Sequence, residues 1–185
     1  MPYGQLFAAI HAPTGENADL LLRELAAGMT VKGFRVAGFV QRDTRRDPNC
    51  CGRLEIENLQ SGEIHVISQA LGTGAKGCKL NPQALADIAN ALLEQLDARI
   101  DLLVLNRFGK GESEGHGFRQ LIEVAIARGI PTIVSVKDEY LLSWSEFAGD
   151  IGVLLPMNYV HISSWYMNTQ PLAEEIEEIL ARDLP

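Results

Sequence analysis

Residues 8–25, AAIHAPTGENADLLLREL, decide the fold class of this chain. The stretch opens as a short apolar run, is interrupted at Pro13 and Gly15, and continues with leucines at the spacing of a helix. A strand that passes through a glycine-containing turn into a helix is the repeating unit of α/β proteins. We therefore expect residues 8–25 to begin an α/β sheet.

The strand–helix alternation of this stretch continues through most of the chain. Four more apolar runs have the length of buried strands: residues 34–40, 101–106, 131–136 and 151–155. Amphipathic helical patterns separate most of them, and Asn81 followed by Pro82 is typical of a helix start. The pattern predicts a mostly parallel sheet with helices on both faces.

One segment alternates differently. Residues 53–68 switch between apolar and polar positions on either side of Ser61 and Gly62. Such a period of two around a turn predicts an inserted antiparallel hairpin at about residues 53–68.

The C-terminal part lacks the strand–helix pattern. Residues 156–170 fit no period, and a short acidic helix is expected from Pro171 onward. We therefore expect one α/β domain over residues 1–155 and a C-terminal extension over residues 156–185.

The charge of the chain excludes two classes of partner. Its 185 residues carry 16 Lys and Arg against 24 Asp and Glu, a net charge of −8. A nucleic-acid binder needs a basic face, and attachment to anionic lipid needs basic clusters, so neither nucleic acid nor membrane is expected as a partner. No apolar stretch reaches the roughly 20 residues that span a bilayer.

The cysteines favour a reducing compartment. Cys50, Cys51 and Cys78 are odd in number and lack the C-x₂-C spacing of a metal site. With no recognisable leader segment in the sequence, we expect a cytoplasmic protein with no metal site.

Three loops should follow the carboxyl ends of parallel strands, where open α/β sheets bind ligands: residues 12–19, 106–117 and 137–140. The first has the layout of a phosphate-binding loop. Read as G-x-x-x-x-G-K-[ST], it has Ala12 and Asn17 for the glycines, Ala18 for the lysine and Asp19 for the hydroxyl. Glu16 and Asp19 would repel a triphosphate at this helix start.

The second loop, NRFGKGESEGHG at 106–117, combines glycines with many ionisable groups. Asn106 and Arg107 stand where a nucleotide hydrolase would carry acids for Mg²⁺ and water. Its residues predict anion binding by Asn106, Arg107 and Lys110, balanced by Glu112 or Glu114. A solvated charged loop is the alternative.

The order of these motifs resembles a known arrangement. The glycine-containing loop, the segment FRVAGFVQRDTRR (34–46), the hairpin LQSGEIHVIS (59–68) and GAKGCKLNPQAL (74–85) occur in that order. Over residues 5–150 the chain resembles the small P-loop nucleoside-triphosphatase family known from thermophiles. Through NRFGKGESEGHGFR (106–119) it resembles more closely an uncharacterised bacterial family with an NrFGKxExxGxGfr signature.

The resemblance implies a P-loop-like fold in which the triphosphatase residues are replaced. The lysine falls on Ala18, the hydroxyl on Asp19 and the acidic pair on Asn106 and Arg107. It also implies a link to molybdenum metabolism, because some members of the closer family are associated with molybdenum uptake.

The first hypothesis is therefore a catalytically degenerate accessory or binding protein for a small anionic ligand, such as an oxyanion or a nucleotide. The expected ligand-binding residues are Thr14, Gly15, Asn17, Asn106, Arg107, Gly109, Lys110 and Glu112.

Two alternatives remain open. One is an active nucleoside-triphosphatase or phosphotransferase that uses Glu112 or Glu114 as non-standard catalytic residues. The other is a protein-interaction scaffold or homodimer, with Trp165, Tyr166 and the acidic tail as its contact surface.

Overall fold

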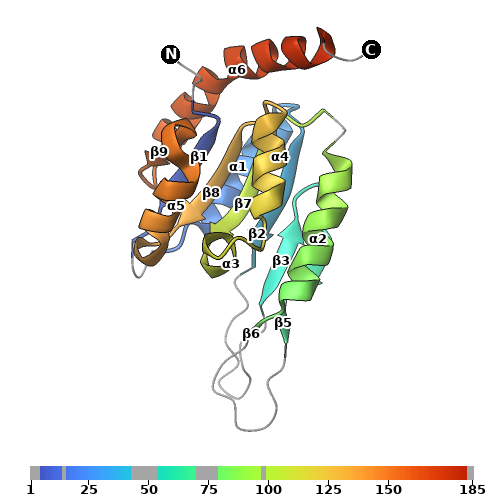
Figure 1. The fold of residues 1–185 in the computed structure, drawn as a ribbon, viewed down its shortest axis with the longest axis vertical. Helices are drawn as coiled ribbons and strands as arrows, with labels where there is room; N and C mark the ends of the chain where they lie inside the picture. The colour runs from blue at the N-terminus through green and yellow to red at the C-terminus, as the bar shows by residue number, and fades with distance from the viewer. Residues whose placement is uncertain (1–4, 14–15, 43–53, 70–78, 97–98, 183–185) are drawn as a thin grey trace.

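The computed structural model describes residues 5–13, 16–42, 54–69, 79–96 and 99–182, with side chains up to residue 170. A seven-stranded sheet with the order β4-β3-β2-β7-β8-β1-β9 forms its centre (Figure 1). Five strands are parallel: β1 (Phe7–His11), β2 (Val36–Gln41), β7 (Leu102–Phe108), β8 (Thr132–Val136) and β9 (Gly152–Leu155). The predicted mostly parallel sheet is confirmed.

The antiparallel hairpin is also confirmed. Strands β3 (Glu55–Asn58) and β4 (Ile64–Val66) pair antiparallel, and β3 extends the sheet antiparallel to β2. A separate two-stranded sheet joins β5 (Ser68–Gln69) to β6 (Lys79–Leu80), directly before the helix that Asn81 caps.

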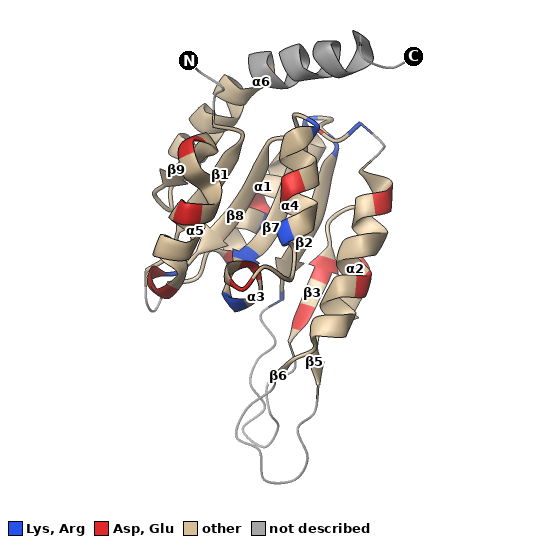
Figure 2. Cartoon of the chain, in the orientation of Figure 1, with Lys and Arg blue, Asp and Glu red and all other residues tan. Residues whose placement is uncertain are grey.

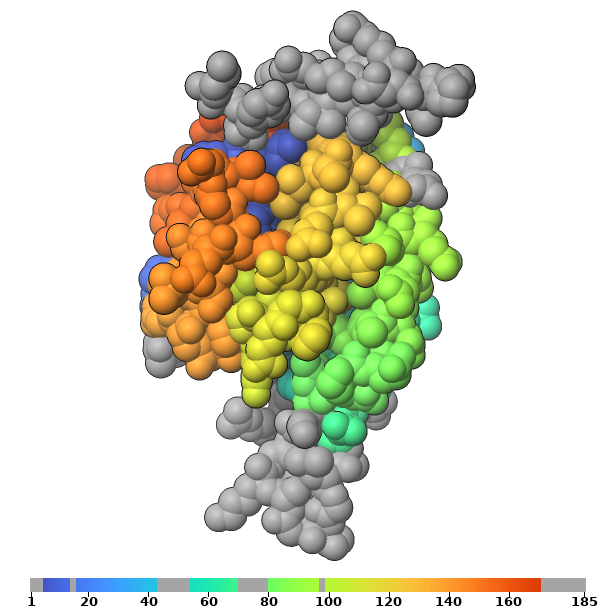
Figure 3. Space-filling model, viewed as in Figure 1, coloured from blue at the N-terminus to red at the C-terminus, as the bar shows by residue number. Residues whose placement is uncertain are grey.

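Helices cover both faces of the sheet. Buried residues of α2 (Pro82–Gln95), α4 (Arg119–Ala127) and α5 (Leu141–Ala148) pack on one face. Those of α1 (Asp19–Val31) and α6 (Tyr159–Arg182) pack on the other. Figure 3 shows the first face, which α5, α4 and α2 cover together with the short α3 (Lys110–Ser113). Two 3₁₀ turns, η1 (Asp138–Tyr140) and η2 (Gly149–Ile151), flank α5.

The helix α6 differs from the sequence prediction. It begins at Tyr159 instead of Pro171 and runs without interruption to Arg182. Its buried residues Ile162, Trp165 and Tyr166 have helical spacing, but its exposed positions include Val160 and Met167. Because apolar residues occupy both faces, the sequence shows no polar contrast and hence no period.

The alternative in which Trp165 and Tyr166 form a contact surface is wrong for these two residues. They are 6% and 3% exposed and pack in the core beside β1 and α1. The indole of Trp165 donates a hydrogen bond to the carbonyl oxygen of Gln5 (2.6 Å), and the Tyr166 hydroxyl donates to that of Asp101 (3.3 Å). Both rings therefore fix α6 to the sheet.

Burial raises the pKa of Tyr166 to about 12, and the nearby negative charge of Asp101 adds to this effect. The Tyr166 phenol ionises near pH 10 in the unfolded chain but only near pH 12 in the folded chain. Its contribution to stability is therefore fully present below pH 10 and is lost as the pH rises towards 12. We expect the free energy of unfolding to fall by roughly 2–3 kcal/mol between pH 10 and 12 because of this residue. Urea unfolding across that range should show a shallower decline for Tyr166→Phe; an unchanged slope would contradict the prediction.

Two parallel strands approach each other closely at Gly38. Its register partner is Val104 of β7, and a Cβ atom on Gly38 would lie 1.8 Å from the Val104 carbonyl oxygen. The backbone φ of Gly38 is +124°, a value that side chains disfavour. Only glycine therefore permits the β2–β7 pairing at this point.

We expect Gly38→Ala to lower the free energy of unfolding by roughly 3–5 kcal/mol, because backbone strain and overpacking add. Gly33→Ala is the matched control: its φ is also positive, at +92°, but no atom lies within 4 Å of the added Cβ. It should lose roughly 1–2 kcal/mol from strain alone. Equal shifts of the two urea midpoints would contradict the steric account.

Candidate functional site

The parallel strands end at one edge of the sheet, and their connections diverge there. From β1 the chain crosses through α1 towards β2, whereas from β8 it crosses through α5 to β9 on the other side of β1. Crevices at such a divergence are where open α/β sheets bind ligands. The crevice here lies between the ends of β1 and β8.

A cavity of about 120 Å³ occupies this crevice. The ends of β1, β7 and β8 and the start of α1 line it, through Ala12, Glu16, Asn17, Ala18, Asp19, Arg107, Ser135 and Lys137. Of the predicted ligand-binding residues, Asn17 and Arg107 therefore meet here. Thr14 and Gly15 lie outside the described residues.

The carboxylate of Asp19 is the centre of the polar contacts at this site. The buried Asn106 donates from Nδ2 to Asp19 Oδ1 (2.6 Å) and accepts at Oδ1 from the Ser135 hydroxyl (2.8 Å). Asn17 Oδ1 accepts from the backbone N–H of Asp19 (2.8 Å). A continuous polar chain therefore joins the start of α1 to β7 and β8.

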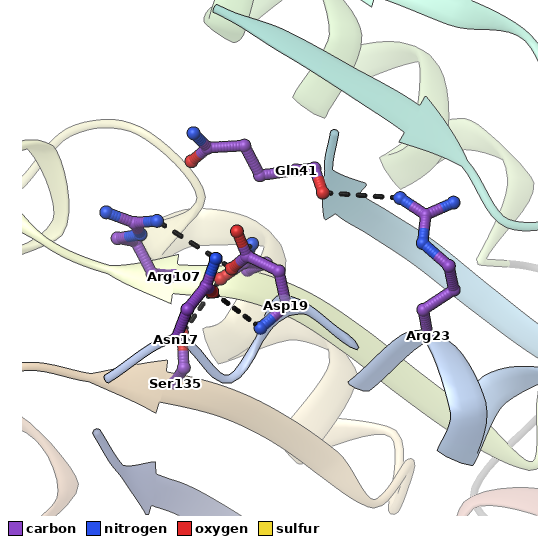
Figure 4. Close-up of polar contacts among 7 residues, drawn as sticks. Asn17, Asp19, Arg23, Gln41, Arg107 and Ser135 are labelled. Carbon is purple, nitrogen blue, oxygen red and sulfur yellow. Dashed lines mark hydrogen bonds and ion pairs between the residues drawn. The ribbon is translucent and has the colours of Figure 1, made fainter. Parts of the chain in front are cut away.

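Figure 4 shows Asn17 and Arg107 converging on Asp19. The Arg107 guanidinium lies 3.7 Å from Asp19 Oδ1, an ion-pair distance longer than that of a hydrogen bond. Arg23 points elsewhere, to the main-chain carbonyl of Gln41, and also pairs with Glu57 (2.5 Å).

Lys137 is the second cation of the cavity. Its ammonium group makes neither a hydrogen bond nor an ion pair with any residue that the structure describes. Arg107, by contrast, already faces a carboxylate. Beside Lys137, His11 Nε2 lies 2.6 Å from Asp138 Oδ1. The sequence placed the loop 137–140 at this edge, but a single lysine in a short loop carried no motif that would have singled it out.

Glu112 closes the loop that follows β7. It is 4% exposed, its Oε2 accepts from the backbone N–H of Gly109 (2.9 Å) and its Oε1 from that of Phe118 (2.9 Å). A Cβ on Gly117 would lie 2.2 Å from Oε1, so the turn fits tightly around this carboxylate. Both oxygens of Glu112 therefore serve to hold the loop together.

Lys110 and Glu114 lie apart from the cavity that Arg107 lines. They form an exposed ion pair of 3.7 Å and line a different, larger cavity of about 840 Å³, between α2 and residues 110–121. The structure therefore divides the predicted charged loop into two parts: Asn106 and Arg107 at the strand ends, and Lys110 and Glu114 beside α2.

Comparison with known proteins identifies the family. The model of the family described as "Protein of unknown function (DUF2478)" matches residues 7–165. The chain belongs to this family. The resemblance to an uncharacterised family that the sequence suggested is thereby confirmed.

Two named proteins are similar to this member of the DUF2478 family. "Molybdenum import ATP-binding protein ModC 2" of Bradyrhizobium diazoefficiens is 33% identical over 171 residues, 92% of this chain. The match spans only 19% of the length of that relative. The crystal structure of THEP1 from the hyperthermophile Aquifex aeolicus aligns with a TM-score of 0.60 and 18% identity, over 90% of this chain and 99% of its own. The fold is thus that of THEP1, as expected.

The described residues of the chain contain neither a cluster of metal ligands nor a helix that could span a membrane. No three His, Cys, Asp or Glu side chains come together there in a way that could hold a metal ion. None of the helices searched there is both long and apolar enough to cross a bilayer.

The contacts of Glu112 predict a structural effect of its removal. In Glu112→Gln one carboxylate oxygen becomes an NH₂ group, which leaves the N–H of Gly109 or Phe118 buried without an acceptor. We expect the free energy of unfolding to fall by about 1–3 kcal/mol, measured by urea denaturation. The control Glu114→Gln removes only an exposed ion pair and should change little. Equal effects of the two variants would contradict the assigned role.

Proposed function

We propose that this protein binds a small tetrahedral oxyanion of the molybdate type in the 120 Å³ cavity and serves molybdenum import without hydrolysing nucleoside triphosphates. The observation that carries the proposal is Lys137, a cation with no described partner that faces a cavity together with Arg107 and the start of α1.

The electrostatics of the cavity favour one compact anion. The N-terminus of the 13-residue helix α1 contributes a partial positive charge, and Ala18 at its cap position provides no side-chain acceptor. Lys137 adds a full charge, and Arg107 is held only loosely by Asp19, so it can also reach an oxygen of the ligand. Glu16 and Asp19 limit the total negative charge that the site accepts.

The size of the cavity supports the same ligand class. Sites for drug-sized ligands usually have volumes of about 300–1,000 Å³. The cavity, at about 120 Å³, lies well below this range, which favours one small tetrahedral oxyanion over a whole nucleotide.

The absence of triphosphate hydrolysis is inferred from the residues at the edge. Ala18 stands where the phosphate-binding lysine is needed and Asp19 where the metal-binding hydroxyl is needed. At the end of β7, Asn106 is occupied by Asp19 and Ser135, and both oxygens of Glu112 bind backbone N–H groups. None of these groups is placed to activate water.

The link to molybdenum rests on the relative from Bradyrhizobium. That protein is named as a molybdenum import ATP-binding protein, and a stretch similar to nearly all of this chain forms one fifth of it. Joining two units in one polypeptide gives them a high effective concentration, which favours a shared task. We therefore infer that the present chain delivers or senses the oxyanion that such an import system handles.

Isothermal titration calorimetry tests the proposal. Molybdate should bind, and Lys137→Ala should weaken binding about 10- to 100-fold, because a hydrogen bond to a charged group contributes about 1.5–3 kcal/mol. The matched control Lys110→Ala removes a lysine of the other cavity and should leave the affinity unchanged.

Titrations with sulfate, phosphate and ATP with Mg²⁺ separate the alternatives. Oxyanion binding without ATP binding supports the proposal. ATP binding tighter than molybdate binding, or ATP hydrolysis that depends on Glu112 or Glu114, would instead support the non-standard nucleoside-triphosphatase.

A further inference from the structure

Two basic and two acidic side chains line the 120 Å³ cavity at the strand ends. Lys137 and Arg107 supply the positive charges. Glu16 and Asp19 supply the negative ones. Figure 2 shows red and blue segments mixed at this edge of the sheet, near the ends of β7 and β8. The full charges of the described lining therefore cancel, and the partial positive charge of the α1 start remains.

The two carboxylates differ in how firmly they are held. The side chain of Asp19 is only 11% exposed, and its Oδ1 accepts from Asn106 Nδ2 (2.6 Å). The amide of Asn106 is itself fixed by the Ser135 hydroxyl (2.8 Å). Glu16 is exposed, and its side chain makes neither a hydrogen bond nor an ion pair with a described residue. An arriving anion can therefore displace Glu16 into water, whereas Asp19 stays beside the cavity.

Asp19 also takes up part of the charge of Arg107. Its Oδ1 lies 3.7 Å from the guanidinium, so a ligand oxygen that approaches Arg107 approaches the Asp19 carboxylate as well. Water and salt screen a partly buried charge less than an exposed one, and the repulsion grows in proportion to the charge of the ligand. Asp19 therefore penalises a dianion about twice as much as a monoanion of the same size.

We propose that Asp19 is the specificity-determining residue of this site: it keeps the preference for dianions weak and the bound oxyanion exchangeable. The inference rests on the proposed function, because it assigns the affinity and the charge selectivity of the same cavity. A weakly held ligand suits a protein that delivers or senses an oxyanion, since such a protein must release it. Asn106 and Ser135 are positioning residues, because they act on the ligand through Asp19.

Calorimetric titration with molybdate and perrhenate measures the charge selectivity. Both are tetrahedral oxyanions of similar size that carry no proton at neutral pH, but molybdate has two charges and perrhenate one. The unaltered chain should bind molybdate at most about tenfold more tightly than perrhenate. Asp19→Asn removes the charge and keeps an oxygen that can accept from Asn106. It should tighten perrhenate binding about tenfold and molybdate binding about 100-fold.

Two further variants separate this effect from a general change of charge. Glu16→Gln removes an equal charge from an exposed position and should tighten molybdate binding no more than about threefold. The control Glu114→Gln removes a charge beside the other cavity and should leave both affinities unchanged. Equal gains for the two anions in Asp19→Asn, or no gain, would overturn the inference.

The outcomes also separate this inference from the proposed function. A preference for molybdate above about tenfold in the unaltered chain overturns the role of Asp19 even where Asp19→Asn fails to fold, which circular dichroism checks. Molybdate binding that Asp19→Asn does not tighten overturns the role of Asp19 and leaves the proposed function intact. Oxyanion binding that occurs only in Asp19→Asn supports the role of Asp19 and overturns the proposed function. No binding in either protein overturns both.

Discussion

The carboxylate of Asp19 organises the carboxyl edge of the sheet. It accepts from Asn106, faces Arg107, and through Asn106 reaches Ser135. These four residues come from α1, β7 and β8, which are far apart in the sequence, so one buried polar chain sets how the first helix sits on two central strands. Buried polar groups are stable only when their hydrogen bonds are satisfied, and here each member satisfies the next.

The same carboxylate limits what the site can bind. An internal negative charge takes up part of the positive potential that an N-terminal helix end and an arginine would otherwise offer to a phosphate chain. Lys137 remains outside this internal pairing. Under the proposed function, the ligand would therefore carry little more charge than one lysine and a shared arginine can balance.

Much of the fold could be predicted from the sequence, because buried strands and amphipathic helices follow local periodicity. The hairpin at residues 53–68 and the cap at Asn81 are examples. The helix α6 could not be predicted from the sequence, because the exposed apolar residues Val160 and Met167 obscure its helical periodicity. The same obscured period left the place of Trp165 open; the ring packs in the core and donates a hydrogen bond to Gln5, 160 residues earlier.

The candidate site was predictable only in part. Asn17, Asn106 and Arg107 stood out because a motif assigns a chemistry to their positions, and the structure brings Asn17 and Arg107 to one cavity. Lys110 belongs to the same loop as Arg107, yet it lines another cavity, because α3 turns the chain towards α2 directly after Gly109. Ser135 and Lys137 reach the site through sheet order, which no local pattern encodes.

The position of β1 has a consequence for how the chain acquires its structure. It lies between β8 and β9, so Phe7 pairs with Thr132 on one side and Gly152 on the other. During synthesis, this early strand must wait for more than a hundred further residues before either neighbour exists. Pairings so distant along the chain make folding slow, and an apolar strand that waits is exposed to aggregation. Completion of the sheet is therefore a late event, and the crevice between β1 and β8 forms only then.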